Sequence, residues 1–472
     1  MMGLRAMVIR QPASTAFVVA LTSRLALVVG THVAQRWPLI PDEGQYVELA
    51  TLAADNRIND FCCGGYGPAL YASTRLYAWQ MHGLVELFGP REWILQMPAV
   101  LYGAAGAYVV TRIAGKFISA QWALVAGLVV ALLPSALLHS STIMRESLIW
   151  LLIAGAAWLV ILWSEDRGLR RLVICSVGLL LVVVGLGWLR DQTAILVAWS
   201  LVPVALFVGN QRRRRIGLMV VVLLVGPWVT ASGPAGLVLL SNSVPMLGSV
   251  RAWMSIEADS SIMVFDAVPF LVPGEESSKP FSVPGEESSP FSVPGEESSK
   301  PRLGGCEGYE STTESGAVGI VDRCTETICI DDECQDIVAG SLIVDNSVTA
   351  SLKAIPGGLA AFYFRPFPWE AIGEQSLIFR LAAVENLLWF VLYGFALFGI
   401  RPLWRRHPAI VIFGSSFFLT AGLGASVTQG NIGTAFRHRL QVLWVVALLA
   451  VVGGERLWTR WQSSSDEPGL PV

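Results

Sequence analysis

AFVVALTSRLALVVGTHV (residues 16–33) and, seven residues later, Pro41-Asp42-Glu43-Gly44-Gln45-Tyr46 together indicate how this chain is organised. The first stretch has 18 residues, of which 12 are Ala, Val, Leu or Phe. Its length is close to the about 20 residues with which a helix spans a bilayer. Asp42 and Glu43 stand where such a chain first emerges into water. Anchoring a helix does not require two adjacent carboxylates, so this pair is a candidate for chemistry at the membrane surface.

Apolar runs of similar length recur along most of the 472 residues, of which 53% are hydrophobic and only 15% charged. A soluble protein of this length would carry about 25% charge. Lipid offers no water to backbone groups, and the runs lack the alternation of a barrel, so the spans should be helical. The sequence therefore predicts an all-α polytopic membrane protein with about ten transmembrane helices. The expected spans are residues 16–33, 93–113, 122–138, 148–163, 172–188, 193–208, 216–235, 381–399, 409–423 and 440–452.

Basic residues predict the orientation of these spans. With the N-terminus in the cytoplasm, 16 basic residues fall in cytoplasmic segments, and the short outer turns carry only Arg145, Arg190, Arg437 and Arg439. This assignment requires residues 68–88 to lie along the interface as amphipathic helices; whether they cross the membrane stays open. The predicted location is the inner (plasma) membrane, with the active site on the outer face.

An acidic block divides the chain. Residues 256–345 hold 19 acidic and 4 basic residues, a net charge of −15, although the whole chain carries only −3. We expect an N-terminal membrane module (1–240, with outer loop 35–92), an exported acidic insert (241–370) and C-terminal membrane helices (371–472). The insert repeats Val-Pro-Gly-Glu-Glu-Ser-Ser from positions 272, 283 and 293. This composition predicts disorder, either as a spacer or as a tract without a role.

Four cysteines follow the repeats: Cys306, Cys324, Cys329 and Cys334. In an exported loop they predict two disulfides, with three pairings open. A zinc site is the alternative, but the Cys-x4-Cys-x4-Cys spacing is unusual for zinc and no His lies nearby. The acids around them fit no calcium-loop pattern and favour a solvated face. A divalent cation is a possible cofactor for the protein, and no other is indicated.

Charged groups recur at the span ends expected on the outer side. They are Asp42-Glu43, Arg145-Glu146, Arg190-Asp191 and Arg437-His438-Arg439. Charge near mid-bilayer costs about 2.5 to 3.5 kcal/mol, so charges retained near spans mark cavities or pathways. Arginine can hold a phosphate leaving group bidentately, and a carboxylate can take the proton of an acceptor hydroxyl. No nucleotide-binding Gly-rich loop is evident, so the donor should be membrane-borne.

Several short motifs also occur in a characteristic order. They are Asp42-Glu43, Gly67-Pro68-Ala69-Leu70-Tyr71, Leu87-Phe88-Gly89, Trp93 with Pro98–Tyr102, Leu133-Pro134-Ser135 and Met144-Arg145-Glu146-Ser147-Leu148. This order resembles the GT-C superfamily of polyprenyl-phosphate-sugar-dependent glycosyltransferases, which includes protein O-mannosyltransferases and lipid A aminoarabinose transferases. The resemblance covers about residues 16–163. Each motif is short and degenerate, so their order and spacing carry the resemblance.

The resemblance implies roles for particular residues. Asp42 would be the catalytic base, with Glu43 beside it in the site, and Arg145 and Glu146 would line the donor phosphate. Aminoarabinose-type members carry a phosphate-contacting Lys where this chain has Gly67. That contact must therefore come from another residue. The candidates are Arg75, Arg145, Arg190, Arg437, His438 and Arg439.

The predicted function is sugar transfer from a polyprenyl-phosphate donor to an acceptor on the outer face, within cell-envelope glycan biosynthesis. The acceptor could be a glycan, a lipid or a protein, and nothing indicates nucleic acid. One alternative is a lipid-linked glycan polymerase or ligase, which would use Arg437-His438-Arg439 and would not need Asp42. Another is a non-enzymatic transporter or surface-assembly scaffold, although the chain lacks the repeated halves and mid-span polar residues frequent in transporters.

Overall fold

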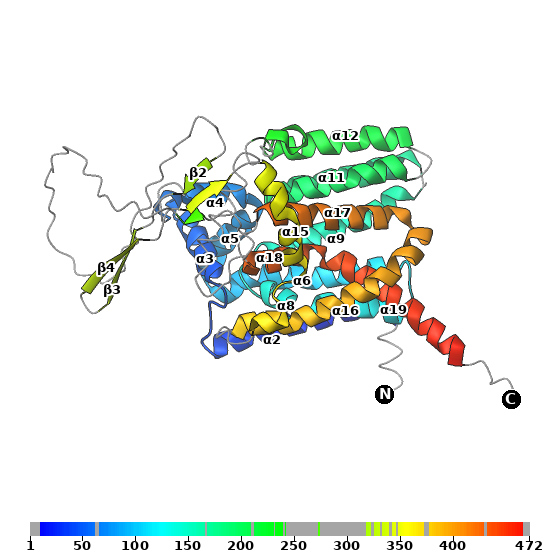
Figure 1. Ribbon diagram of the computed structural model, residues 1–472, viewed down its shortest axis with the longest axis horizontal. Coiled ribbons are helices and arrows are strands. Elements are labelled where there is room, and N and C mark those ends of the chain that lie inside the picture. Colours follow the sequence, from blue (N-terminus) through cyan, green and yellow to red (C-terminus); the bar gives the residue numbers. More distant parts are fainter. Residues whose placement is uncertain are drawn as a thin grey trace. The chain divides into compact units, whose positions relative to one another are not determined.

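The computed structural model describes most of the chain outside the acidic insert (Figure 1). The described residues are 10–61, 66–165, 168–208, 212–230, 232–238, 241, 272–273, 318–321, 325–330, 333–338, 342–345, 348–371, 377–428 and 432–465. The chain divides into two compact units. The first comprises Met1–Asn242, Leu359–Ala425 and Ile432–Val472, and the second comprises Ser243–Gly358 with Ser426–Asn431.

The first unit is helical. Its N-terminal helices are α2 (Pro12–Val33), α3 (Pro41–Ala54), α4 (Tyr66–Ser73), α5 (Arg75–Phe88), α6 (Glu92–Ala114), α7 (Ala120–Leu132), α8 (Pro134–His139), α9 (Glu146–Ser164), α10 (Leu169–Gly187), α11 (Asp191–Phe207) and α12 (Arg212–Val229). Its C-terminal helices are α16 (Leu377–Arg406), α17 (Pro408–Thr428), α18 (Ile432–Arg439) and α19 (Leu443–Ser465). Short 3-10 turns cover Ile58–Asp60, Pro234–Gly236, Pro368–Ala371 and Leu440–Val442. Helix α15 (Val348–Phe364) joins the two units in sequence.

Seven helices within the described residues are long and apolar enough to cross a membrane. They correspond to α2, α6, α9, α10, α16, α17 and the stretch from α18 through α19. This confirms a multi-pass helical membrane protein, while the predicted count of ten spans stays unconfirmed. The apolar helices α7 and α11 are shorter. The predicted span 122–138 is divided because Pro134 starts a new helix, since proline lacks the N–H that would continue α7.

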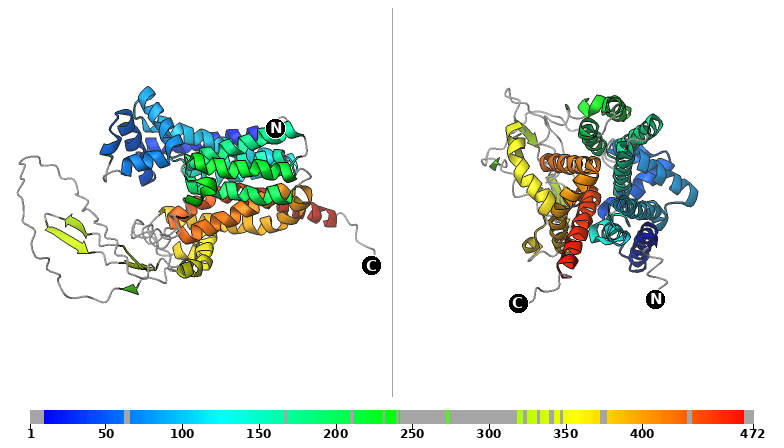
Figure 2. Two further views of the ribbon diagram at one scale, coloured as in Figure 1. Left: turned by 90° about the horizontal axis from the view of Figure 1, so that it is seen from above. Right: turned by 90° about the vertical axis from the view of Figure 1, so that its right-hand side faces the viewer.

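Small residues bring the helices together. α2 packs against α6 and α7, and Ala20, Ala104, Ala107 and Ala131 form a fully buried cluster there. α16 and α19 also pack together, and a Cβ at Gly453 would overlap the backbone of Phe395. Small residues allow such close approach in membranes, where packing rather than water drives helix association. End-on, Figure 2 shows the blue-to-green helices beside the orange and red ones within this unit.

The residues before α6 form short helices rather than a further long one. α3 and α5 have 14 residues each and α4 has 8, and α3 packs against α5. None is long enough to cross a bilayer, which is compatible with the interfacial placement predicted for residues 68–88. In Figure 1 these helices lie at one end of the bundle.

The described part of the second unit contains short antiparallel strands. β1 (Val272–Pro273) and β2 (Val318–Val321) both pair with β5 (Leu342–Asp345), and β3 (Thr325–Ile330) pairs with β4 (Glu333–Val338). The predicted all-α class therefore describes the membrane unit rather than the insert. In the β3–β4 register Cys329 is opposite Cys334. Cys306 and Cys324, like the second and third repeats, lie outside the described residues, so the disulfides stay a prediction.

Candidate functional site

Helix α3 positions the two adjacent acids. It begins with Pro41, whose ring sets a helical φ, and Asp42 and Glu43 follow in its first turn. Carboxylates are favoured there because the first amides are unpaired and the helix dipole is positive at that end. Oδ2 of Asp42 accepts a hydrogen bond from Nη1 of Arg437 at 2.7 Å, and 41% of the Asp42 side chain is exposed. Asp42 is therefore held by a distant arginine and still reachable from solvent.

Glu146, the first residue of α9, lies at the centre of the surrounding charges. Its side chain is only 2% exposed, and Oε1 accepts a hydrogen bond from Nη2 of Arg190 at 3.1 Å. Nε of Arg437 lies 3.5 Å from the same oxygen, so Arg437 connects Asp42 with Glu146. Nη1 of Arg190 donates to Nε2 of His438. Within the described residues, Oε2 of Glu146 is buried without a hydrogen-bond partner.

Arg145 and Tyr46 lie beside this group. Nη1 of Arg145 donates to the carbonyl of Leu189 at 2.8 Å, and its buried Nε has no partner in the described part of the chain. Tyr46 stands one helical turn after Asp42 and is buried, and the charges of Arg145 and Glu146 act on it. Burial raises the pKa of the Tyr46 phenol, so the ring stays neutral. Below, "the Asp42 cluster" means Asp42, Tyr46, Arg145, Glu146, Arg190, Arg437 and His438.

The Asp42 cluster carries an excess of positive charge. Three guanidinium groups face two carboxylates, and His438 is neutral at the nitrogen that accepts from Arg190. Burial, and then the charge of Arg145, lower the pKa of Arg190 to about 10, which leaves it charged at neutral pH. Arginine N–H groups that are buried without a full set of acceptors favour an anion with several oxygens. The cluster is therefore suited to a phosphate.

Glu43 points away from Asp42 and is fully buried. Its Oε2 accepts the amide of Leu39 at 2.8 Å, and its Oε1 accepts the amide of Ile143 at 2.9 Å. Nε2 of Gln96 donates to Oε1 at 3.3 Å. Glu43 thus ties the start of α3 to α6 and to the turn that precedes α9. Its hydrogen bonds give it the geometry of a positioning residue.

Arg439 is likewise directed away from the cluster. It is fully buried, and its Nη1 donates to the carbonyl of Tyr363 and to Oδ1 of Asn386, both at 2.8 Å. The guanidinium carbon lies 4.7 Å from the ring centre of Trp389 and 4.4 Å from that of Phe436. These contacts fix the end of α18 against α16, and they thereby place the two residues that precede Arg439.

Two further candidates lie outside the cluster. Arg75 is exposed, with its guanidinium carbon 5.9 Å from the ring centre of Trp79. Oδ1 of Asp191 accepts the amide of its neighbour Gln192 at 2.8 Å. Sequence reasoning also missed Tyr46, although its place four residues after Asp42 puts both on one helix face.

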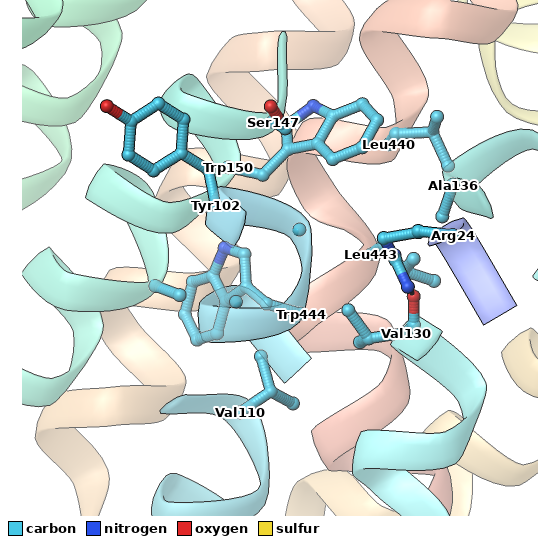
Figure 3. Close-up of a pocket in the computed structure, with 13 residues that line it drawn as sticks. Arg24, Tyr102, Val110, Val130, Ala136, Ser147, Trp150, Leu440, Leu443 and Trp444 are labelled. Atoms are coloured by element: carbon cyan, nitrogen blue, oxygen red, sulfur yellow. Dashed lines mark hydrogen bonds between the residues drawn. The ribbon is translucent and has the colours of Figure 1, made fainter. Parts of the chain in front are cut away.

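A small, mostly apolar pocket is lined in part by Ser147, the residue that follows Glu146 in the sequence (Figure 3). Ser147, next to Glu146, lines it together with Trp150, Trp444 and Arg24. Oγ of Ser147 and the indole nitrogens of both tryptophans are buried without partners in the described residues. The other lining residues are Tyr102, Gly103, Gly106, Val110, Val130, Ala136, Ala154, Leu440 and Leu443. The cavity volume is about 20 Å³, which leaves room for about one water molecule and not for a lipid chain.

Metal-binding groups are a separate question. Among the described residues, no group of three or more His, Cys, Asp or Glu side chains is arranged to hold a metal ion. A divalent cation therefore stays a prediction from the sequence.

Comparison with known proteins finds a family model that part of the chain matches. Residues 73–230 match the family model for dolichyl-phosphate-mannose-protein mannosyltransferase. The match confirms the resemblance to the GT-C superfamily. It indicates a membrane glycosyltransferase of the GT-C type. No curated protein and no solved structure gives a significant match. The matched segment contains Arg145, Glu146 and Arg190, whereas Asp42 and Arg437 lie on either side of it.

Proposed function

We propose that this GT-C protein is an inverting glycosyltransferase that moves a sugar from a polyprenyl phosphate to a hydroxyl acceptor on the outer face of the membrane. One observation carries the proposal. The partly exposed Asp42 pairs with Arg437 at 2.7 Å. Arg437 also lies beside the buried Glu146, and Glu146 in turn pairs with Arg190. A proton acceptor and an arginine-rich anion site are thereby adjacent.

The reaction follows from these positions. Asp42 takes the proton of the acceptor hydroxyl, whose oxygen attacks the anomeric carbon of the donor sugar. The bond from that carbon to the phosphate oxygen breaks, and its electron pair leaves with the polyprenyl phosphate. Arg437 and Arg190, with Arg145 beside them, stabilise the negative charge that develops on the phosphate. Arg145 then takes the place of the absent lysine at position 67.

The family match supports a lipid-borne donor, because it is consistent with a lipid-linked sugar. The pocket lined by Ser147 has a volume of about 20 Å³, room for about one water molecule, so it adds nothing on the lipid chain. The sugar and the acceptor are open, so a panel of donors is needed.

The test is Asp42→Asn in membranes supplied with polyprenyl-phosphate-linked sugars, with release of polyprenyl phosphate as the measurement. Asparagine can still accept the hydrogen bond from Arg437 but cannot take a proton, so transfer should fall by about 10²- to 10⁴-fold. Glu48→Gln is the matched control, because Glu48 is exposed on the same helix. A fully active Asp42→Asn protein would rule out Asp42 as the base.

The position of His438 favours a second candidate, a lipid-linked glycan polymerase or ligase. Both Arg437 and His438 contribute to the cluster, and such an enzyme would not require Asp42. Comparison of Asp42→Ala with Arg437→Ala in a complementation assay separates the two functions. Activity that survives the loss of Asp42 but not the loss of Arg437 would favour the polymerase or ligase.

A further inference from the structure

Helices α16 and α19 touch through two glycines towards their C-terminal ends. A Cβ at Gly399 would overlap the carbonyl oxygen of Leu449, and a Cβ at Gly453 would overlap that of Phe395. The two backbones are therefore in direct contact at this level. The residues that follow each glycine start from the same crossing, because each position adds only about 1.5 Å along a helix.

Both helices end on the membrane face opposite to the Asp42 cluster. Nη1 of Arg406, the last residue of α16, donates to the carbonyl of Phe117, and Oε1 of Glu455 in α19 accepts the amide of Ser119 at 2.9 Å. The neighbouring Lys116 pairs with the acid that follows the C-terminal end of α9, whereas the Asp42 cluster adjoins the N-terminal end of that helix. The sequence predicts that this face is cytoplasmic.

Four arginines follow the crossing. Arg401 and Arg405 stand on α16, one helical turn apart. Arg456 and Arg460 have the same spacing on α19. All are exposed except Arg456, which is half-buried, and the charges of the other three act on it. Within the described residues none of the four side chains forms an ion pair or donates a hydrogen bond. They form an exposed positive surface that no acid from the described part of the chain neutralises.

Tryptophans are interspersed with these arginines. Trp404 and Trp458 are each 49% exposed and Trp461 is 61% exposed, and the ring centres of the last two lie 5.2 Å apart. Exposed tryptophan is typical of the level of the lipid head groups, because its ring is apolar and its N–H is polar. In Figure 1 the red end of α19 extends past the neighbouring helices. Below, "the Arg456 patch" means Arg401, Trp404, Arg405, Arg456, Trp458, Arg460 and Trp461.

Neither membrane orientation nor the helix dipole accounts for the Arg456 patch. The orientation rule requires basic residues on this side but not their convergence from two helices. The dipole favours cations in a last turn, and Arg456 lies nine residues before the end of α19. Elsewhere on this face Lys116 and Arg171 share Glu165, so their charges are balanced. The patch lacks such an acid among the described residues, which favours an external anion.

We propose that the Arg456 patch binds the head group of an anionic phospholipid from the surrounding membrane. Guanidinium groups hold phosphate oxygens through paired hydrogen bonds, and basic sites between membrane helices bind anionic head groups at the cytoplasmic surface. The exposed indole rings offer apolar contact to the rest of a lipid, which a free phosphate lacks. This binding is independent of the reaction proposed for the Asp42 cluster at the other face.

The first test is native mass spectrometry of the purified protein in a neutral detergent. The protein is titrated with phosphatidylglycerol, with phosphatidylcholine, and with phosphatidylglycerol in the presence of inorganic phosphate. Phosphatidylglycerol should bind at least about tenfold more tightly than phosphatidylcholine, since each nearby basic residue contributes about fivefold at an anionic surface. Millimolar inorganic phosphate should not displace it. Equal binding of the two lipids, or displacement by inorganic phosphate, would overturn the proposal.

The second test removes half of the arginines of the patch. Arg456→Gln with Arg460→Gln should weaken phosphatidylglycerol binding about 30-fold. The matched control is Arg112→Gln with Arg170→Gln, which removes the same charge from exposed residues of α6 and α10 on the same face. The control should leave binding nearly unchanged. Equal losses in the two proteins would show that the lipid responds to the general charge of this face, and the patch would not be a site.

A third protein keeps every charge. Trp458→Ala with Trp461→Ala preserves the basic residues that orient the chain, so membrane insertion should be normal. Loss of the indole rings should weaken phosphatidylglycerol binding, because the apolar part of the lipid loses its contacts. Unchanged binding would mean that the arginines hold a phosphate group without recognising a lipid, and would overturn the assignment.

Discussion

Each end of α9 has an acid that pairs with cations, but the two acids differ in their exposure to solvent. At its N-terminal end Glu146 is 2% exposed and pairs with Arg190, which is 11% exposed. Immediately after its C-terminal end Glu165 is 21% exposed and pairs with Lys116 at 3.0 Å and Arg171 at 3.2 Å. Both ends therefore place an acid between two cations. Only the first end removes the acid almost completely from solvent.

The difference teaches how to recognise a site among ion pairs. At the Glu165 end, Nζ of Lys116 also lies 4.7 Å from the ring centre of Trp158, so the cation is stabilised without any ligand. At the Glu146 end, Oε2 of Glu146 and Nε of Arg145 are buried without partners in the described residues. Buried polar groups are normally paired. Because the two ends carry similar charges, the burial of the acid and of its cation partner, rather than the presence of charge, distinguishes the Glu146 end.

The largest expected effect comes from neutralising the acid at each end. Glu146→Gln leaves buried arginines without their counter-charge, and breaking a buried pair costs about 3–5 kcal/mol. Glu165→Gln disrupts a more exposed pair and should cost about 0–1 kcal/mol. Denaturant unfolding in detergent measures both, and transfer assays should show activity lost only in Glu146→Gln. Equal losses of stability would remove the distinction between the two ends.

A smaller effect is expected from exchanging arginine for lysine at each end. Arg437 uses two different nitrogens to reach Asp42 and Glu146, and a lysine ammonium cannot reproduce that fork. Arg437→Lys should therefore lower transfer on the order of 10²-fold. Arg171 reaches Glu165 through one nitrogen, so Arg171→Lys should leave both transfer and stability nearly unchanged. If the two substitutions were equally tolerated, Arg437 would be acting as a point charge.

The fold of the membrane unit was largely predictable, because apolar runs reveal long helices directly. The length of an apolar run does not reveal the local effects of prolines and charges, which limit how well the helices are predicted. Pro134 splits one apolar run into α7 and α8. The first four residues of α12, Arg212–Arg215, are all basic, and this helix is absent from those within the described residues that qualify as spans. Prolines and charges within an apolar run therefore leave the predicted number of ten spans unconfirmed.

For the candidate site, the sequence predicts which residues come together better than it predicts which of them contact each other. Arg145, Arg190 and Arg437 break the orientation rule, which predicts a shared role for them, and the structure brings all three together. The contact of Asp42 with Arg437 joins residues 395 positions apart and depends on how α18 packs, which one sequence cannot give. Asp42 and Glu43 look equivalent in sequence. They differ because neighbours on a helix project in different directions, so one is buried and the other reaches the cluster.

Salt should give the smallest effect and the most direct comparison of the two ends. The Debye length falls from about 10 Å at 0.1 M to about 3 Å at 1 M, and this screening acts mainly on charges that contact solvent. The stability difference between Glu165→Gln and the unsubstituted protein should therefore disappear at 1 M NaCl. The difference for Glu146→Gln should persist, because its partners are buried away from the salt. If high salt also abolished the Glu146→Gln difference, mobile ions would be entering the cluster. The site would then be open to water rather than kept free for a ligand.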